Sequence, residues 1–129
     1  MIVVDASAIL ELLLNTREAS RVAERLFVAG ETLHAPHLLD LEVAQVLRRY
    51  AAAGALTDER GDQALEDLGD LPLERYPHNL FLDRIWELRH NLTAYDAAYV
   101  ALAEALAAPL VTRDAALARV RHRARVEAR

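Results

Sequence analysis

The stretch that decides the fold reads TAYDAAYVALAEALAAPLVTRD and covers residues 93–114. Its first part, residues 93–108, has a helical pattern in which the only charged residues are Asp96 and Glu104. A helix that is apolar on nearly all sides is typical of a protein interior, so we expect this one to be buried. A proline ends the helix, and residues 110–112 form a short apolar run typical of a buried strand. The stretch therefore predicts a buried helix that leads directly into a strand of a central sheet.

The same alternation of strand and helix patterns extends over the whole chain. Strand patterns cover residues 2–4, 32–35, 73–76 and 110–112, with a further edge strand expected at 124–126. Helical patterns cover residues 6–15, 18–29, 37–53, 57–69, 80–89, 93–108 and 115–120. Strands that alternate with helices pair in parallel and carry helices on both faces of the sheet. We therefore predict a single α/β domain over residues 1–129, a three-layer α/β/α sandwich with a short, mostly parallel sheet.

Composition excludes several classes of protein. The chain has 129 residues, a net charge of −5 and no cysteine. One domain is therefore expected, and disulfide, thiolate and zinc–cysteine chemistry are excluded. No stretch reaches the roughly 18 uninterrupted apolar residues that a membrane span needs. Asp5 stands where a secretory signal would carry positive charge, so we expect a soluble cytoplasmic protein without membrane contact.

Four acidic residues stand apart from the many acids on solvated helix faces. Asp5 directly follows the first strand, and Asp114 follows the fourth strand after one intervening residue. Glu42 borders the apolar stripe of the helix after the second strand, and Asp96 lies in the first turn of the buried helix. Ligand sites in such folds lie outside the carboxyl ends of the strands, so these acids are predicted to converge there. Each also has a structural alternative, which is helix capping for the three aspartates and a salt bridge to an arginine such as Arg49 for Glu42.

This convergence predicts a metal site. Carboxylates gathered within ~4–6 Å repel one another, so some become protonated unless a cation neutralises them. Oxygen ligands favour Mg²⁺ or Mn²⁺ over zinc, and the five histidines show no ligand spacing. We expect the ion to be held mainly by Asp5, Asp96 and Asp114, with Glu42 orienting a water molecule or completing the coordination shell. The predicted reaction is hydrolysis of a phosphodiester bond, and the chain has no nucleotide-binding loop or serine-hydrolase motif that favours another chemistry.

The segments that carry these acids resemble a known family. The pieces MIVVDASA, LLDLEVAQVLRR and LTAYDAAYVALAEALAAPLVTRD, in this order, are similar to those of PIN domains, and more closely to the toxin nuclease of a VapBC-type toxin–antitoxin pair. The resemblance covers nearly the whole chain and implies Mg²⁺- or Mn²⁺-dependent endoribonuclease activity. It further implies a homodimer and a small inhibitory antitoxin, a VapB-like DNA-binding protein. By position it assigns the acidic quartet to Asp5, Glu42, Asp96 and Asp114, with Ser7 and Thr112 as neighbouring polar residues. Relatives often have Asn where this chain has Gln45, a departure that leaves the acids intact.

Arginines near the carboxyl terminus are candidates for binding RNA. They are Arg113, Arg119, Arg121 and Arg123, in a segment that is basic although the whole chain is acidic. A solvated, functionless edge is the alternative.

Two other functions remain open. A phosphotransfer domain of the receiver or haloacid-dehalogenase type also uses acids at strand ends, but it relies on a lysine and this chain has none. The other is a non-catalytic interaction module whose aspartates serve only as caps. A specific Mn²⁺ site would separate that module from a nuclease.

The first helix pattern suggests where a protein partner binds. Apolar residues cover more than one face of it, at Ile9, Leu10, Leu12, Leu13 and Leu14. Since a core needs only one apolar stripe, we expect a partner groove beside this helix. The alternative is that neighbouring helices bury both faces.

Overall fold

Strands and helices alternate along the chain as the sequence predicts. The computed structural model describes residues 1–129. The strands are β1 (Ile2–Val4), β2 (Leu33–Pro36), β3 (Leu73–Tyr76), β4 (Leu110–Thr112) and β5 (Val126–Ala128). The α-helices are α1 (Ala6–Leu13), α2 (Ala19–Leu26), α3 (Leu38–Ala52), α4 (Asp58–Asp70), α5 (Leu82–Glu87) and α6 (Ala94–Leu106). Two short 3₁₀ helices, η1 (His78–Phe81) and η2 (Ala115–Arg119), complete the set.

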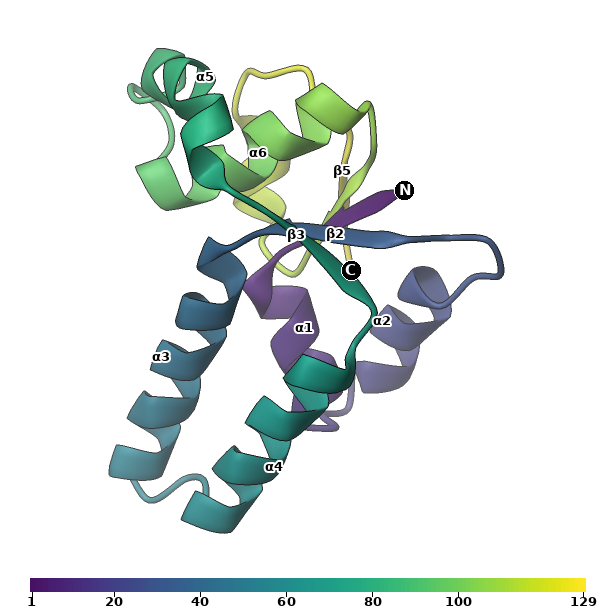
Figure 1. The fold of residues 1–129 in the computed structure, drawn as a ribbon, viewed down its shortest axis with the longest axis vertical. Coiled ribbons are helices and arrows are strands. Elements are labelled where there is room, and N and C mark those ends of the chain that lie inside the picture. Colours follow the sequence, from purple (N-terminus) through teal and green to yellow (C-terminus); the bar gives the residue numbers. More distant parts are fainter.

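The five strands form one sheet in the order β3-β2-β1-β4-β5, and every neighbouring pair is parallel. Helices α5 and α6 cover one face of this sheet, while α1, α2, α3 and α4 lie on the other (Figure 1). The three-layer α/β/α prediction is thus confirmed. Because β1 is the central strand, the chain leaves it toward β2 on one side and reaches β4 on the other, which creates a topological switch point at the carboxyl end of β1.

The core lies on both faces of the sheet and explains why β1 and α6 are so apolar. All three residues of β1 are fully buried. Helix α6 has seven consecutive buried residues, from Ala97 to Ala103. Thr93 caps this helix by accepting a hydrogen bond from the Asp96 N–H at 3.1 Å. It ends where Ala107 takes a left-handed conformation with φ +50°, slightly before the predicted end.

Several helices are shorter than predicted, and three further differences have local reasons. The pattern over residues 80–89 divides into η1 and α5, because apolar periodicity does not separate a 3₁₀ turn from an α-helical one. Strand β5 lies two residues later than expected, where Val126 and Ala128 pair with β4. Pro36 is the last residue of β2 instead of following the strand. Strand β1 pairs with β2 only as far as His34. The missing N–H of Pro36 therefore costs no hydrogen bond on that side.

The apolar residues of α1 pack against the core to different extents. Ile9 and Leu13 are buried, and Leu10, Leu12 and Leu14 are partly buried against the core. Helix α1 contacts α2, α3 and α4, which surround it (Figure 1). Neighbouring helices thus cover part of both faces, while Leu10, Leu12 and Leu14 keep some exposed surface, and a partner groove beside this helix stays a prediction.

Exposed apolar side chains gather elsewhere. Leu80, Leu82 and Trp86 on η1 and α5 are exposed, as is Tyr95 at the start of α6. No helix of this structure is long and apolar enough to cross a membrane.

Candidate metal-binding carboxylate site

The four predicted acids all lie at the carboxyl edge of the sheet. Asp5 follows β1, and Asp114 follows β4, the strand next to it. Glu42 is in the second turn of α3, and Asp96 is in the first turn of α6. The site therefore lies at the topological switch point, where ligands of parallel α/β sheets bind.

Asp5 is the most buried of the four, with only 8% of its surface exposed. One carboxylate oxygen accepts hydrogen bonds from the Ser7 hydroxyl at 2.6 Å and from the Ala8 N–H at 3.2 Å, and the other accepts one from the Thr112 hydroxyl. Burial raises the pKa of Asp5 despite these bonds, and the charge of Asp96 raises it further. The helix-cap interpretation of Asp5 is thus correct, but it does not account for a charge buried without a positive partner.

The side chains of Ser7 and Thr112 meet between the ends of β1 and β4, next to Asp5. The two hydroxyl oxygens are 3.3 Å apart, and the Ser7 hydroxyl also accepts the Arg113 N–H at 2.9 Å. Thr112 accepts the Asp114 N–H at 2.9 Å. Because both hydroxyls also donate to Asp5, this network fixes the carboxylate in one orientation.

Glu42 is half-buried and has a partner that the sequence did not predict. The Tyr99 hydroxyl of α6 donates to its Oε1 at 2.5 Å, and the proposed ion pair with Arg49 is not formed. Burial raises the pKa of Glu42, and the charges of Asp5 and Asp96 add to the increase. Tyr99 was missed because a tyrosine within an apolar helix is typical of a core residue. The only signal was its spacing of three residues from Asp96, one helical turn.

Asp96 and Asp114 complete the cluster from the more exposed side. Burial raises the pKa of Asp96, and the charge of Asp114 raises it further. Asp114 is exposed and caps η2 by accepting the Ala116 N–H at 2.9 Å. Asp96 therefore lies within electrostatic reach of Asp5, Glu42 and Asp114, and links them into one cluster.

No arginine or histidine forms an ion pair with any of these four acids. Their oxygen-only chemistry and unneutralised charge fit a hard divalent cation. No three His, Asp or Glu side chains are close enough together to hold a metal ion as they stand. An ion held by three of these acids would therefore need their side chains to rotate toward one another.

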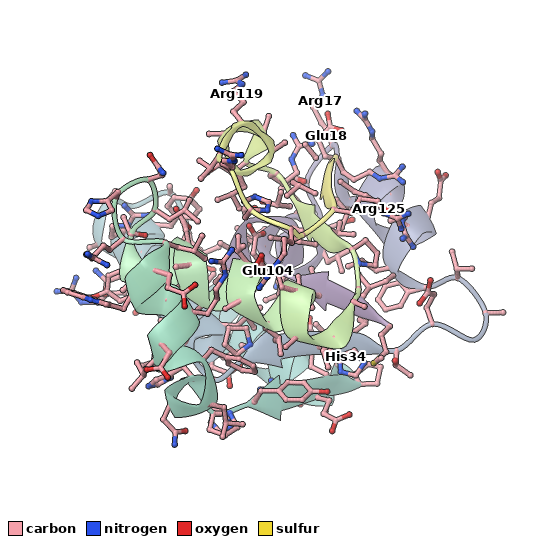
Figure 2. All side chains as sticks on the ribbon, turned by 90° about the horizontal axis from the view of Figure 1, so that it is seen from above. Arg17, Glu18, His34, Glu104, Arg119 and Arg125 are labelled. Carbon is pink, nitrogen blue, oxygen red and sulfur yellow. The ribbon has the colours of Figure 1, made fainter.

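The four candidate arginines have different surroundings. The Arg113 guanidinium turns away from the acids, donating to the Arg129 carbonyl and lying 3.5 Å from Glu11. Arg123 lies 3.4 Å from Glu104, at the far end of α6. Arg119 and Arg121 are exposed and free of ion pairs, and Figure 2 shows Arg119 extending outward. Only these last two have guanidinium groups free for a phosphate.

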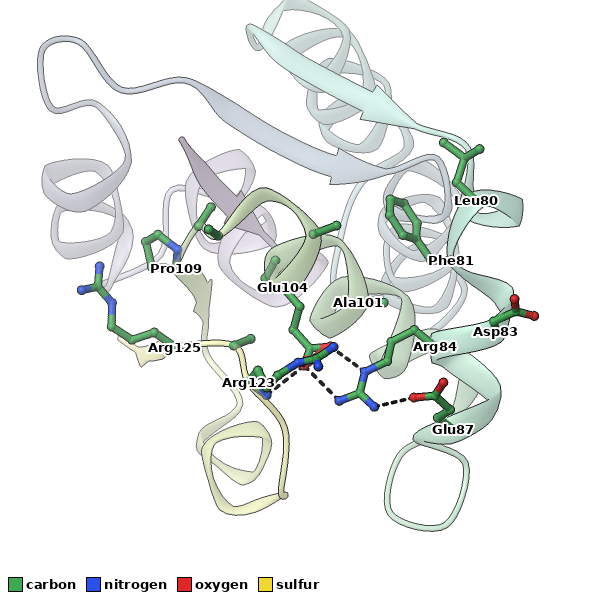
Figure 3. Close-up of a pocket in the computed structure, with 15 residues that line it drawn as sticks. Leu80, Phe81, Asp83, Arg84, Glu87, Ala101, Glu104, Pro109, Arg123 and Arg125 are labelled. Carbon is green, nitrogen blue, oxygen red and sulfur yellow. Dashed lines mark hydrogen bonds and ion pairs between the residues drawn. The ribbon is translucent and has the colours of Figure 1, made fainter.

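A cavity of about 840 Å³ lies away from the carboxylate site. It lies between α5, the second half of α6 and the carboxyl-terminal segment, and its floor is the ion pair of Glu104 with Arg84 (Figure 3). Glu104 is eight residues after Asp96, about 12 Å along the helix axis. The charged residues Arg84, Glu104 and Arg123 of this cavity are thus paired with one another, and none of the four acids lines it.

The raised pKa values predict how the metal-free protein depends on pH. A carboxyl group with a raised pKa binds its proton more tightly when folded, so its favourable contribution is present at low pH and is lost as pH rises through that pKa. In EDTA, Glu42→Gln should therefore melt near the wild-type temperature at about pH 4 and increasingly above it toward neutrality, by about 3 °C. Melting curves of both proteins across this pH range test the prediction. Taking the difference between their melting temperatures cancels the contributions of other titrating groups. Glu66→Gln, an exposed acid on α4, is the control and should show no such trend.

Comparison with known proteins identifies the family of this chain. The PIN domain family model matches residues 2–123. Ribonuclease VapC9 of Mycobacterium tuberculosis is 52% identical over 88% of this chain and 86% of its own length. Ribonuclease VapC12 of the same organism is 42% identical over 98% of each chain. The crystal structure of VapBC2 from Rickettsia felis, bound to a DNA fragment from its promoter, matches with a TM-score of 0.71 and 16% identity over 98% of both chains, a likeness of fold alone. The chain belongs to the PIN domain family and, within it, to the VapC ribonucleases.

Proposed function

We propose that this protein is a Mg²⁺- or Mn²⁺-dependent endoribonuclease that acts as the toxin of a toxin–antitoxin pair. The observation that carries the proposal is the cluster of four carboxylates, electrostatically linked and without a cationic partner, at the switch point of the sheet. Asp5 is buried without a positive partner, and a charge buried in this way is costly unless a cation neutralises it. Membership of the VapC ribonucleases supports RNA as the substrate.

The proposed roles follow from the position of each acid. Asp5, Asp96 and Asp114 would hold the ion, and the hydroxyls of Ser7 and Thr112 keep Asp5 oriented toward it. When bound, the ion supplies positive charge that stabilises the carboxylates and polarises a phosphate oxygen. Glu42 orients the attacking water through its carboxylate. Arg119 and Arg121 are the exposed guanidinium groups available to the RNA backbone.

The proposed partners are an RNA substrate, a small VapB-like antitoxin and a second copy of this chain. The Rickettsia felis structure that shares the fold is of a VapBC2 pair on promoter DNA. In this chain the exposed apolar side chains of η1, α5 and the start of α6 are available for a protein partner, and the apolar residues beside α1 are partly exposed.

A non-catalytic interaction module is the second candidate, since Asp5 and Asp114 do cap α1 and η2. RNA cleavage assays separate the two functions. The wild type should cleave RNA with Mn²⁺, lose activity in EDTA, and be inactive as the Asp5→Ala, Asp96→Ala double variant. Asp62→Ala, an exposed acid on α4, is the control and should cleave like the wild type. Cleavage by the double variant in EDTA would remove the metal-nuclease proposal.

A further inference from the structure

We infer that Tyr99 is the positioning residue of Glu42: its hydroxyl fixes one oxygen of this carboxylate and leaves the other as the acceptor that faces the reacting water. The inference deepens the proposed function and rests on it, because it assigns Glu42 a partner in the same site.

The contact itself divides the two oxygens of Glu42. Oε1 accepts the Tyr99 hydroxyl at 2.5 Å, while no protein group donates a hydrogen bond to Oε2. A carboxylate that accepts one strong hydrogen bond keeps its second oxygen free for another donor. In this site, the free oxygen is Oε2 of Glu42, the acid to which the proposed function gives the role of orienting water.

The tyrosine side is rigid. Only 2% of Tyr99 is exposed, and its ring is packed within the run of buried residues of α6. It lies one helical turn after Asp96, so the same rigid helix presents Asp96 and holds Glu42 of α3, which packs on the opposite face of the sheet. A tyrosine has few rotatable bonds, and its packed ring cannot follow Glu42 if that side chain moves.

Glu42 needs such a tether because its surroundings repel it. Asp5 and Asp96 both act on it with negative charge, and no arginine pairs with it. Without a donor, its flexible side chain would rotate away from the other acids. Small displacements of a group that orients a reactant lower the rate strongly, even when binding is unchanged.

Tyr99→Phe tests the inference, since it removes the hydroxyl and keeps the buried ring. We expect kcat for RNA cleavage in Mn²⁺ to fall about 10–100-fold, as is typical when an orienting partner is lost. KM should change less than about 2-fold, and Mn²⁺ affinity less than about 3-fold, because the proposed ligands are intact. In a Glu42→Gln background, the same substitution should reduce kcat little further.

Tyr76→Phe is the matched control. It removes another tyrosine hydroxyl that is hydrogen-bonded to a buried side chain, His34, at 2.7 Å between β3 and β2. Both variants lose one such bond, but only Tyr99→Phe should lose kcat. A wild-type kcat for Tyr99→Phe, or an equal loss in both variants, overturns the inference.

A stability measurement separates failure of the inference from failure of the proposed function. If the wild type cleaves no RNA with Mn²⁺, the proposed function fails. The interaction between Tyr99 and Glu42 is then tested by melting temperatures in EDTA. Tyr99→Phe, Glu42→Gln and the double variant should give non-additive shifts. Additive shifts would show that Tyr99 does not hold Glu42 and would overturn the inference whatever the activity.

Discussion

Asp96→Asn is expected to lower RNA cleavage about 10³-fold or more, while raising the melting temperature of the metal-free protein by about 4 °C. The two effects have opposite signs because the same charge serves the reaction and destabilises the fold. Asp96 interacts with the charges of Asp5, Glu42 and Asp114, and burial raises its pKa. Asparagine keeps the shape of the side chain and removes the charge.

The size of the stabilisation follows from two opposing contributions. Two charges ~5 Å apart repel by roughly 3 kcal/mol at an effective dielectric constant near 20. Since Asp96 is only half-buried, solvent reduces this value. The lost interaction of the charge with the amino terminus of α6 opposes it by ~0.3–1 kcal/mol. A net gain of about 1 kcal/mol remains, which corresponds to about 4 °C for a chain of this length.

Melting curves in EDTA and cleavage rates in Mn²⁺ check both effects. Asp58→Asn, also in the first turn of a helix but exposed on α4, is the control. It should lose the helix-terminus interaction without relief of repulsion, and so melt slightly below the wild type. An Asp96→Asn variant that behaves like this control would mean that Asp96 is only a part of the helix cap.

Glu104→Ala should have the largest effect on stability, lowering the melting temperature by about 10 °C. The Glu104 side chain is 5% exposed and accepts two hydrogen bonds from Arg84, at 2.7 and 3.0 Å. The Arg123 N–H donates to it at 2.8 Å, so one carboxylate ties α5 and the carboxyl-terminal segment to α6 (Figure 3). Burial alone would raise the pKa of Glu104, but these donors and the charges of both arginines lower it.

Breaking a fully buried ion pair costs about 3–5 kcal/mol. We expect about 2–3 kcal/mol here, because Arg84 is partly solvated and keeps Glu87 as a partner. Glu87→Ala removes only the exposed side of the same network and should shift the melting temperature by less than about 2 °C. Thermal melts of both variants measure the difference. RNA cleavage below the melting temperature should be unchanged in both, since Glu104 is remote from the four acids.

The sequence was sufficient for the parts of the fold that depend on local pattern. The apolar run of β1 and the nearly all-apolar helix α6 require burial, and an acid after a strand must lie at the edge of the sheet. Asp5 and Asp114 therefore followed from chain order alone. Glu42 and Asp96 followed from helix periodicity together with the family resemblance.

The remaining features depend on contacts between distant segments, which local pattern does not contain. Tyr99 meets Glu42 only because α3 and α6 pack across the end of β2, on opposite faces of the sheet. How much of α1 is covered depends on where α2 and α4 pack, which the apolar pattern of the helix does not contain. Arg113 is next to Asp114 in sequence, yet its guanidinium turns to Glu11 and the carboxyl-terminal residue.

The central claim is that these carboxylates form one metal site, and a calorimetric titration with Mn²⁺ tests it most directly. Wild type and Asp96→Asn, both freed of metal, are titrated at the same pH near neutrality. The account predicts a saturable site in the wild type whose affinity falls at least about 10-fold in Asp96→Asn, while Asp58→Asn binds like the wild type. Equal Mn²⁺ affinity in wild type and Asp96→Asn, or no binding by the wild type at millimolar Mn²⁺, would contradict it.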